Sequence, residues 1–229
     1  MPLRGKGMLI TLTEVKSRDE SDFNEWYNRE HIDERVNLPG FHRARRYVAI
    51  KGTPKKVPKY FATYECDQVS DLATPGYLHL LANQTKWSQS VMARFTRFQR
   101  LTLRVRVDLT HGVGGALTAV RFTPDPHKRN SLIAWLQDTS LPKAIAREGM
   151  LGACAAENDL DVANAPVQDK SMDHPKAIDA EWIVLLEGAD PAATAAAARK
   201  TFKRTVLKRF GVNKAPSFAT YRLLFGSER

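Results

Sequence analysis

The residues best suited to acid–base chemistry lie in one stretch, EWYNREHIDERVNLPGF, which spans residues 25–41. Its apolar spacing predicts an amphipathic helix that ends at a Pro-Gly pair. Helical periodicity brings His31 beside Tyr27, one turn earlier, and Glu34 follows three residues later. Because histidine titrates near neutral pH, His31 is a candidate general acid or base, with Tyr27 and Glu34 as catalytic partners.

The alternative is that His31 is structural. A half-buried imidazole that is hydrogen-bonded to a backbone carbonyl or to Glu34 would leave the same pattern in the sequence. No metal site is predicted, because no His-x-x-x-H or His-carboxylate ligand spacing occurs and the other histidines are scattered. We also predict no cofactor.

Five further side chains are candidate contacts for a substrate, from the same helix and from the strands that follow it: Trp26, Glu30, Arg45, Tyr47 and Tyr64. An arginine at a pocket mouth can hold a carboxylate through two hydrogen bonds, so an acidic ligand is compatible with the pattern. The structural alternatives are core packing of the aromatic rings and salt bridges of the arginine. Since Arg43 and Arg45 share one strand face and Arg46 takes the other, one of these sets must meet a carboxylate or reach solvent.

The composition is that of a soluble protein with a buried core. The chain has 229 residues, of which 43% are hydrophobic, and no stretch approaches the ~20 apolar residues of a membrane span. No signal peptide is evident, so the cytoplasm is the expected location. Cys66 and Cys154 lack metal or redox spacing and are expected to be small buried residues of a reducing compartment.

The charge is positive and uneven. Residues 1–109 carry 19 Lys and Arg against 12 Asp and Glu, a net +7, whereas residues 110–229 contribute the other +3 of the total of +10. Such a surface attracts anions. A solvated basic face is the simpler interpretation, and no motif that reads nucleic acid accompanies the charge. We therefore predict neither nucleic acid nor a membrane as a partner.

The chain repeats itself at an offset of 109 residues. The superposed pairs include Phe23 and Leu132, Trp26 and Trp135, Ile32 and Leu141, and Gly40 and Gly149. Apolar positions are kept and most polar ones are lost, since Tyr27 becomes Leu136 and His31 becomes Ser140. If His31 is functional, only the first half carries the site.

Other segments match at different offsets. Segment 9–15 resembles 116–122, segment 59–67 resembles 181–190, and segment 97–105 resembles 217–225. The middle pair each carry a glutamate near the strand end, Glu65 and Glu187. The change of offset places an insertion at 157–179, which its polar, Pro- and Asp-containing composition predicts to be a surface loop.

Each half reads in the order strand, helix, strand, strand, helix, strand, which is a ferredoxin-like βαββαβ unit. The predicted fold class is α+β, with one unit over residues 1–110 and a second, degenerate unit over 115–229, joined by the turn residues HGVGG. In such a unit the helices cover only one face of the sheet. Because both faces here carry apolar residues, two units in one chain are expected to close sheet against sheet as an intrachain, pseudo-dimeric α/β barrel.

Details of the elements can also be predicted. Asp22 is the expected cap of the first helix. The first helix has two apolar stripes, one through Trp26 and one through Ile32, and a regular helix cannot turn both toward one sheet. The helix should therefore bend or change its packing near residues 30–32. Three further elements are predicted: a helix over 71–93, a strand over 95–107, and a helix that follows Asp190-Pro191 over the run AATAAAARKTFKRTVLKRF.

The segment EWYNREHIDERVNLPGFHRARRY resembles the first helix and second strand of dimeric α/β-barrel proteins, especially EthD-like and uncharacterised relatives with the pattern W-Y-x-x-x-H-x-x-x-x-x-x-x-P-G-F. Both halves are similar to such a domain, the first more strongly. The superfamily includes muconolactone-isomerase-like enzymes, cofactor-free monooxygenases, cyclases of aromatic polyketides, haem-degrading or haem-containing branches and ligand-binding regulators. The resemblance therefore implies a fold and leaves the reaction open.

Three functions remain as hypotheses. The first is a metal-free enzyme that acts on a small hydrophobic or aromatic, in some cases acidic, compound by proton transfer (isomerase or cyclase) or by cofactor-free oxidation. The second is a non-catalytic protein that binds such a ligand. The third, an RNA-binding module, ranks last because the strands lack the aromatic signature of RNA-recognition motifs. The first two predict a cavity between the sheet and the first helix, and a homodimer on top of the intrachain pseudo-dimer is compatible with either.

Overall fold

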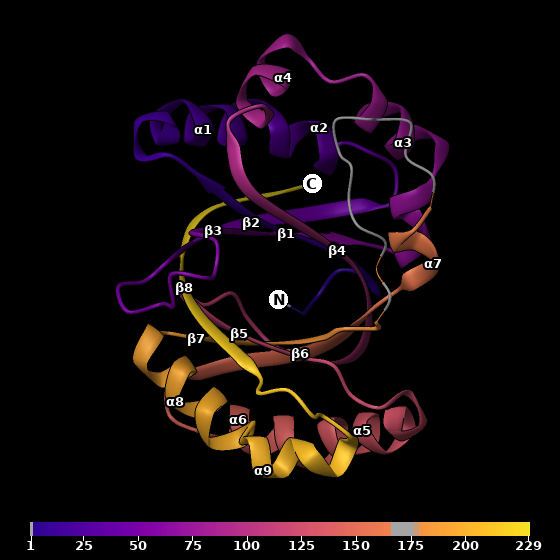
Figure 1. The fold of residues 1–229 in the computed structure, drawn as a ribbon, viewed down its shortest axis with the longest axis vertical. Helices are drawn as coiled ribbons and strands as arrows, with labels where there is room; N and C mark the ends of the chain where they lie inside the picture. Colours follow the sequence, from indigo (N-terminus) through magenta and orange to yellow (C-terminus); the bar gives the residue numbers. More distant parts are fainter. Residues whose placement is uncertain (1, 166–176, 178) are drawn as a thin grey trace.

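The computed structural model describes residues 2–165, 177 and 179–229. Within these residues the strands form one closed barrel in the order β1-β3-β2-β8-β5-β7-β6-β4 (Figure 1). The strands are β1 (Gly7–Val15), β2 (Phe41–Ala49), β3 (Tyr60–Cys66), β4 (Phe95–Thr110), β5 (Ala116–Phe122), β6 (Met150–Asn158), β7 (Trp182–Gly188) and β8 (Ser217–Glu228).

Helices cover the outside of the barrel in two groups, one for each half of the chain (Figure 1). The first group is η1 (Ser17–Asp19), α1 (Glu20–Trp26), η2 (Tyr27–His31), α2 (Ile32–Val36), η3 (Val69–Ala73), α3 (Pro75–Ala82) and α4 (Lys86–Met92). The second is η4 (Pro126–Lys128), α5 (Arg129–Trp135), η5 (Leu136–Ser140), α6 (Leu141–Ile145), α8 (Pro191–Thr201), α9 (Arg204–Leu207) and η6 (Lys208–Phe210). The short helix α7 (Leu160–Ala163) follows β6 in the chain but lies beside α3 and packs on η3 and β4 of the first half (Figure 1).

The two halves join through the edges of their sheets. β2 of the first half pairs with β8 of the second, and β4 pairs with β6, so neither unit leaves an edge strand unpaired. The inner faces of both halves then share one core inside the barrel, which contains Ile10, Phe61, Leu117 and Tyr221. The predicted fold class, two tandem ferredoxin-like units in an intrachain α/β barrel, is confirmed.

The strand register corrects the alignment of the two halves. Tyr64 opposes Leu9, and its counterpart Leu186 opposes Thr118, so β5 matches β1 at an offset of 109 and not 107. The pairing of β1 with β4 and of β5 with β8 shows in the same way that β8 matches β4 at an offset of 118 residues and not 120. The sequence comparison was wrong by two residues in both strands. An error of two is invisible to hydrophobic patterning, because side chains of a strand alternate between faces with a period of two.

The first helix of each half contains one wide π turn at the matching position, η2 and η5. A π turn holds about one residue more than an α turn, which rotates the following residues by roughly 100°. Ile32, in α2, therefore packs into the same core as Trp26, in α1, and both are fully buried. The predicted change of packing near residues 30–32 is confirmed, and the inserted residue is its cause.

Two helices that were predicted as continuous are broken. The segment 71–93 forms η3, α3 and α4, because the chain leaves the helix after Ala82 and Thr85 then caps α4 by accepting a hydrogen bond from the Ser88 backbone NH at 2.9 Å. In the second half α8 ends at Thr201, where Phe202 turns into the core, and α9 starts only at Arg204.

Two smaller predictions were also wrong in part. Asp22 does not cap the first helix, which begins with η1; its carboxylate instead accepts hydrogen bonds from the Trp87 indole at 3.0 Å and from Arg94. The predicted loop at 157–179 starts with two residues of β6 and the short helix α7, and residues 166–176 and 178 lie outside the described residues.

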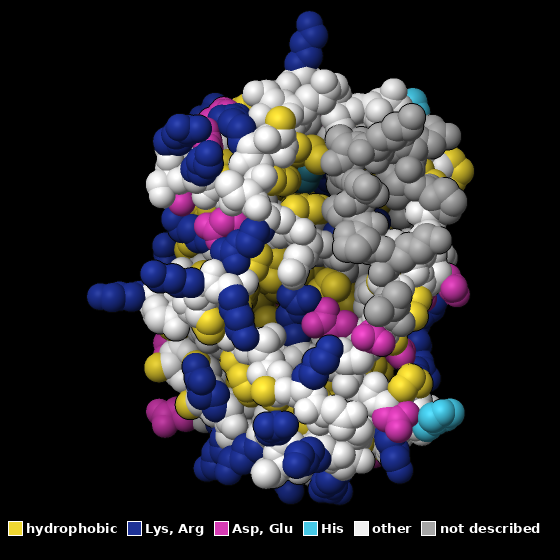
Figure 2. All heavy atoms as spheres, in the orientation of Figure 1, with side chains coloured by type: hydrophobic (Ala, Val, Ile, Leu, Met, Phe, Trp, Pro, Cys, Tyr) yellow, Lys and Arg dark blue, Asp and Glu magenta, His cyan; other side chains and the backbone are white. Residues whose placement is uncertain are grey.

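The remaining expectations concern single features. Cys66 and Cys154 are buried free thiols, as predicted. No helix in the described part of the chain is long and apolar enough to cross a membrane. Lys and Arg side chains are spread over both halves of the face in Figure 2.

Candidate functional site

A small cavity lies between the sheet and the helices of the first half. Its volume is about 30 Å³, which is room for one or two water molecules. β1, the first helix, β3, the α3–α4 pair and the start of β4 provide its walls, which include Trp26, Tyr27, His31, Tyr64, Phe95 and Arg100. The cavity is thus in the place where the sequence predicted one, although it is small.

His31 borders this cavity from the π turn. Its side chain is only 8% exposed, and its ring packs against Trp26 and Tyr27, with centroid separations of 4.1 and 4.8 Å. Nδ1 is buried and has no hydrogen-bond partner among the described residues. The expected alternative, a half-buried imidazole bonded to a carbonyl or to Glu34, is therefore not what the structure contains.

The charge state of His31 follows from its surroundings. Burial, and then the positive charges of Arg35 and Arg46, lower the pKa of His31 well below its usual value of 6.5. The imidazole is thus neutral at pH 7. A neutral imidazole has one nitrogen that can accept a proton or a hydrogen bond from a bound molecule.

Three hydroxyl groups form a short chain beside the histidine. The Tyr64 hydroxyl donates a hydrogen bond to the Tyr27 hydroxyl at 3.1 Å, and the Tyr27 hydroxyl lies 3.0 Å from Thr11 Oγ1. Burial, together with the neighbouring Tyr27, raises the pKa of Tyr64 well above 10, so this phenol stays neutral. The chain connects β3, the π turn and β1, and it offers hydroxyl donors to the cavity.

Two arginines border the cavity and a third lies behind it. Arg35 is buried and donates from Nη1 to the His31 carbonyl oxygen at 3.2 Å and to Glu34 at 3.1 Å. The Arg46 guanidinium lies 4.2 Å from the centre of the Tyr27 ring. Arg100 borders the cavity beside Tyr77, its Nε is buried without a partner among the described residues, and none of the described lining residues is acidic.

The structure separates the predicted site residues into three groups. Trp26, Tyr27, His31 and Tyr64 meet at the cavity. Glu30 and Glu34 belong to the same helix but do not line it. Glu30 accepts hydrogen bonds from Thr85 and Ser88, and Glu34 pairs with Arg35 while burial raises its pKa. Arg45 and Tyr47, the third group, lie on the other side of the sheet.

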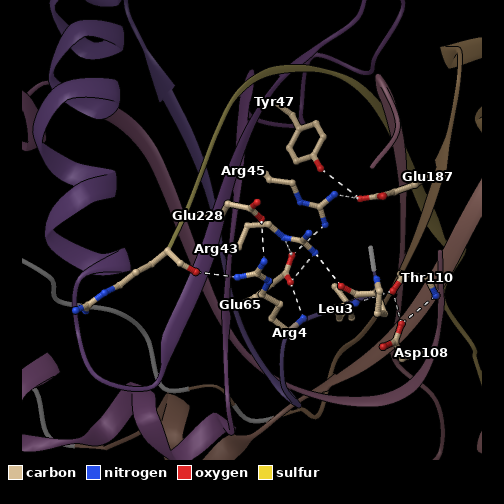
Figure 3. A network of polar contacts seen from close by, with 12 residues as sticks. Leu3, Arg4, Arg43, Arg45, Tyr47, Glu65, Asp108, Thr110, Glu187 and Glu228 are labelled. Carbon is tan, nitrogen blue, oxygen red and sulfur yellow. Dashed lines mark hydrogen bonds and ion pairs between the residues drawn. The ribbon is translucent and has the colours of Figure 1, made fainter. Parts of the chain in front are cut away.

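Arg45 and Tyr47 belong to a polar network inside the barrel (Figure 3). Arg45 bridges the halves, because it pairs with Glu65 of β3 at 3.2 Å and with Glu187 of β7. The Tyr47 hydroxyl donates to Glu187 at 3.4 Å, and Arg43 holds Glu65 through two hydrogen bonds of 3.0 and 2.8 Å. These side chains are structural partners of one another, so the prediction that Arg45 and Tyr47 contact the same ligand as His31 does not fit this geometry.

The cavity residues that sequence reasoning missed include Thr11, Arg35 and Arg100. Arg100 sits in a strand with several other arginines, and together they were interpreted as a basic surface. Alternation along the strand could have indicated that Arg100 faces the helices. That inference needs the register of the strand, which the sequence did not define.

The second half lacks the groups that give this site its chemistry. At the matching positions Leu136 replaces Tyr27, Ser140 replaces His31 and Leu186 replaces Tyr64, and all three are buried. The aliphatic side chains join the core of that half. The described residues also contain no cluster of three or more His, Cys, Asp or Glu that could hold a metal ion.

The fold is shared with proteins of known structure. No protein-family model matches the chain, and no curated protein matches its sequence. Among solved structures, an anthrone oxidase-like protein superposes with a TM-score of 0.62 at 11% identity, over 97% of this chain and 92% of that one. A putative monooxygenase from Lactobacillus acidophilus gives 0.57 at 11% identity, over 98% and 97%. The chain has the dimeric α/β-barrel fold.

A dimeric α/β barrel can also carry haem, since a haem-binding protein from Thermus thermophilus superposes with a TM-score of 0.52 at 8% identity, over 98% of this chain and 93% of that one. The cavity at His31 does not fit that group. Trp26 and Tyr27 pack directly against the imidazole that would have to bind iron, with centroid separations of 4.1 and 4.8 Å.

Proposed function

We propose that the cavity at His31 binds a small aromatic compound and that His31 accepts a proton from it, in a cofactor-free monooxygenase reaction. The observation that carries the proposal is the buried Nδ1 of a neutral imidazole, which has no partner among the described residues and borders an aromatic cavity. A fixed, neutral imidazole beside a substrate is a suitable general base.

The arginines supply the second part of the proposed mechanism. Removing a proton from the substrate leaves an anion in a site where the described lining residues include no carboxylate. Arg100 has an unpartnered Nε there, and Arg35 adds a second positive charge. Both would stabilise the anion by Coulomb attraction, which is strong where water is excluded. The Tyr27 hydroxyl, which accepts from Tyr64, can donate a hydrogen bond to an oxygen of the same anion.

Dioxygen would complete the reaction without an external reductant. With anthrone as the model compound, the ring CH2 loses one proton to His31, and the resulting carbanion supplies the electrons that reduce dioxygen. One oxygen atom becomes the new carbonyl oxygen, and the other leaves as water with the two hydrogens of the CH2 group. The four electrons lost by the carbon equal the four that dioxygen accepts. An isomerase or cyclase would use the same proton transfer but would consume no dioxygen.

The cavity must open before such a compound can enter. Anthrone is far larger than one or two water molecules, and the outer wall of the cavity consists of partly exposed side chains, Met92, Phe95 and Phe98. Met92 is the last residue of α4, and Phe95 and Phe98 follow it in β4. The helices α3 and α4 are joined by a short non-helical link at residues 83–85. Displacing the side chains of this wall would extend the cavity.

Non-catalytic binding is the second candidate, and a specific observation favours it. The charged groups that act on His31 are Arg35 and Arg46, so the protonated imidazole has no carboxylate to stabilise it. A base that is hard to protonate is a weak base. If this effect dominates, His31 and the tyrosines bind the ligand through hydrogen bonds and perform no reaction.

Oxygen uptake with anthrone, measured beside its binding affinity, tests both candidates. For the enzyme we expect dioxygen consumption and anthraquinone formation in equal amounts. His31→Gln should then lower turnover by about 100-fold or more while changing Kd by less than about threefold. The matched control is Ser140→Ala at the equivalent position of the second half, which should leave turnover unchanged.

The other outcomes are equally distinct. Tight binding without oxygen uptake, weakened in His31→Gln, identifies a binding protein. Turnover that is unaffected by His31→Gln contradicts the role of the histidine, and a wild-type protein that neither binds nor oxidises anthrone or its hydroxylated derivatives contradicts the proposal as a whole.

A further inference from the structure

A second and larger cavity lies at one end of the barrel, away from His31. Its volume is about 250 Å³, and both halves line it: Leu12 and Gln99 come from the first, and Ala119, Arg121 and Tyr221 from the second. The loop between β2 and β3 closes one side with Lys56, Val57 and Pro58. Figure 2 shows a hollow between the two halves with a hydrophobic floor and with both basic and acidic side chains at its border.

The cavity exists because the second half has small residues facing the barrel interior. Ala119 opposes Ala219 across β5 and β8, at the position where Ile10 opposes Leu101 across β1 and β4. The aliphatic pair fills its side of the barrel, whereas the alanine pair leaves space. Filling an interior is the ordinary result in a packed core, so a space maintained by small residues is available to a ligand.

The floor of the cavity carries one polar group that lacks a partner. Tyr221 is fully buried, and its hydroxyl makes no hydrogen bond within the described residues. At the matching position β4 has Leu103, which fits the same barrel without a polar atom. A buried hydroxyl without a partner is unfavourable, and a bound acceptor atom would remove this penalty.

The rim of the cavity is positively charged. Arg121 holds both carboxylate oxygens of Glu181, at 3.0 and 2.7 Å, and also donates to Gln99 at 2.8 Å, so Glu181 is neutralised. Lys56 is exposed and has no ion-pair partner among the residues that the structure describes. The net charge at the rim is therefore that of one lysine.

We propose that this cavity is a second binding site, for a small organic anion with an apolar body, such as an aromatic monocarboxylate. The apolar body would pack on Leu12, Ala119 and Ala219 in place of the missing aliphatic side chains. The carboxylate would accept from Tyr221 or pair with Lys56. A volume of about 250 Å³ equals roughly eight water molecules, which is enough for a single-ring acid. The proposal stands independently of any reaction at His31.

Benzoate and its uncharged analogue benzamide are suitable probes, with Kd measured by ligand-observed NMR titration. We expect benzoate to bind the wild-type protein about tenfold more tightly than benzamide. Lys56→Gln should weaken benzoate about threefold, since an exposed ion pair contributes less than 1 kcal/mol. Ala219→Leu, which restores the side chain of the first half, should abolish binding, and Tyr221→Phe keeps the proposal testable if Ala219→Leu does not fold.

His31→Gln is the matched control, because it alters the other cavity and should leave the Kd for benzoate unchanged. Loss of benzoate binding in His31→Gln would assign the probe to the first cavity and overturn the proposal. The same holds if the wild-type protein does not bind benzoate, if benzamide binds equally well, or if both Lys56→Gln and Tyr221→Phe bind benzoate like the wild type.

Discussion

Removing Arg45 should test whether the barrel depends on its buried ion network. In Arg45→Met the aliphatic length of the side chain is kept while the charge is lost. Glu65 retains its two hydrogen bonds from Arg43, but among the described residues Glu187 keeps only the bond of 3.4 Å from Tyr47. A buried carboxylate is thereby left without a cation, and breaking a buried pair in this way costs about 3–5 kcal/mol.

Urea unfolding followed by tryptophan fluorescence measures this loss directly. For a chain of this length the expected decrease corresponds to a fall in Tm of about 10 °C. The matched control is Arg97→Met, because Arg97 pairs with Glu14 through side chains that are 40% and 24% exposed. Such an exposed pair contributes less than about 1 kcal/mol.

A second substitution separates the orphaned charge from simple loss of packing. If Glu187 is the group that suffers, Arg45→Met combined with Glu187→Gln should be more stable than Arg45→Met alone by about 1–2 kcal/mol, since the carboxamide is uncharged. An Arg45→Met protein within about 1 kcal/mol of the wild type would falsify the reasoning. Equal instability of the single and double variants would show that packing, and not charge, governs the network.

Three further predictions concern stability in urea. The folded protein holds the pKa of His31 well below 6.5 and the unfolded chain does not, so the unfolded state binds more protons below pH 6.5. The free energy of unfolding should therefore fall by up to about 1.4 kcal/mol for each pH unit below 6.5. His31→Gln should remove this pH dependence. Gly40→Ala should cost about 1–2 kcal/mol, because Gly40 has φ +83° and a Cβ there would lie 3.0 Å from the Asp71 carboxylate. Gly76→Ala, in open space on α3, should instead stabilise by up to about 1 kcal/mol, and an equal loss in both variants would contradict the account. Tyr64→Phe should cost about 1 kcal/mol through its lost hydrogen bond to Tyr27, and an unchanged stability would show that this bond contributes nothing.

The sequence predicted the architecture well because the repeat carries most of the information about it. Trp26 and Trp135, with the apolar residues around them, define the same helix twice, and the order of elements then allows few topologies. The breaks within the second helix of each half were missed. They depend on tertiary packing, such as the burial of Phe202, and local propensity does not report it.

The site could be predicted only where one helix holds its members together. His31 and Tyr27 are four residues apart on one helix, so their proximity follows from local geometry. Tyr64, Arg45 and Tyr47 come from strands, and whether a strand residue faces the helices or the barrel interior depends on register and on which face is covered. Tyr64 borders the cavity at His31 and the other two lie inside the barrel, a difference that alternation alone cannot predict because it treats both faces alike.

The buried network explains why the two halves of the barrel cannot be identical. Cys154 occupies the position in β6 that corresponds to Arg45 in β2, since Cys154 opposes Asp108 just as Arg45 opposes Gly226. Burial, and then Glu187, raise the pKa of the Cys154 thiol, so it stays neutral. Arg43 and Arg45 therefore balance Glu65 and Glu187, whereas an arginine in place of Cys154 would add an unpaired buried charge. Arg45 thus pairs with both glutamates, one from each half of the barrel, while its counterpart Cys154 carries no charge.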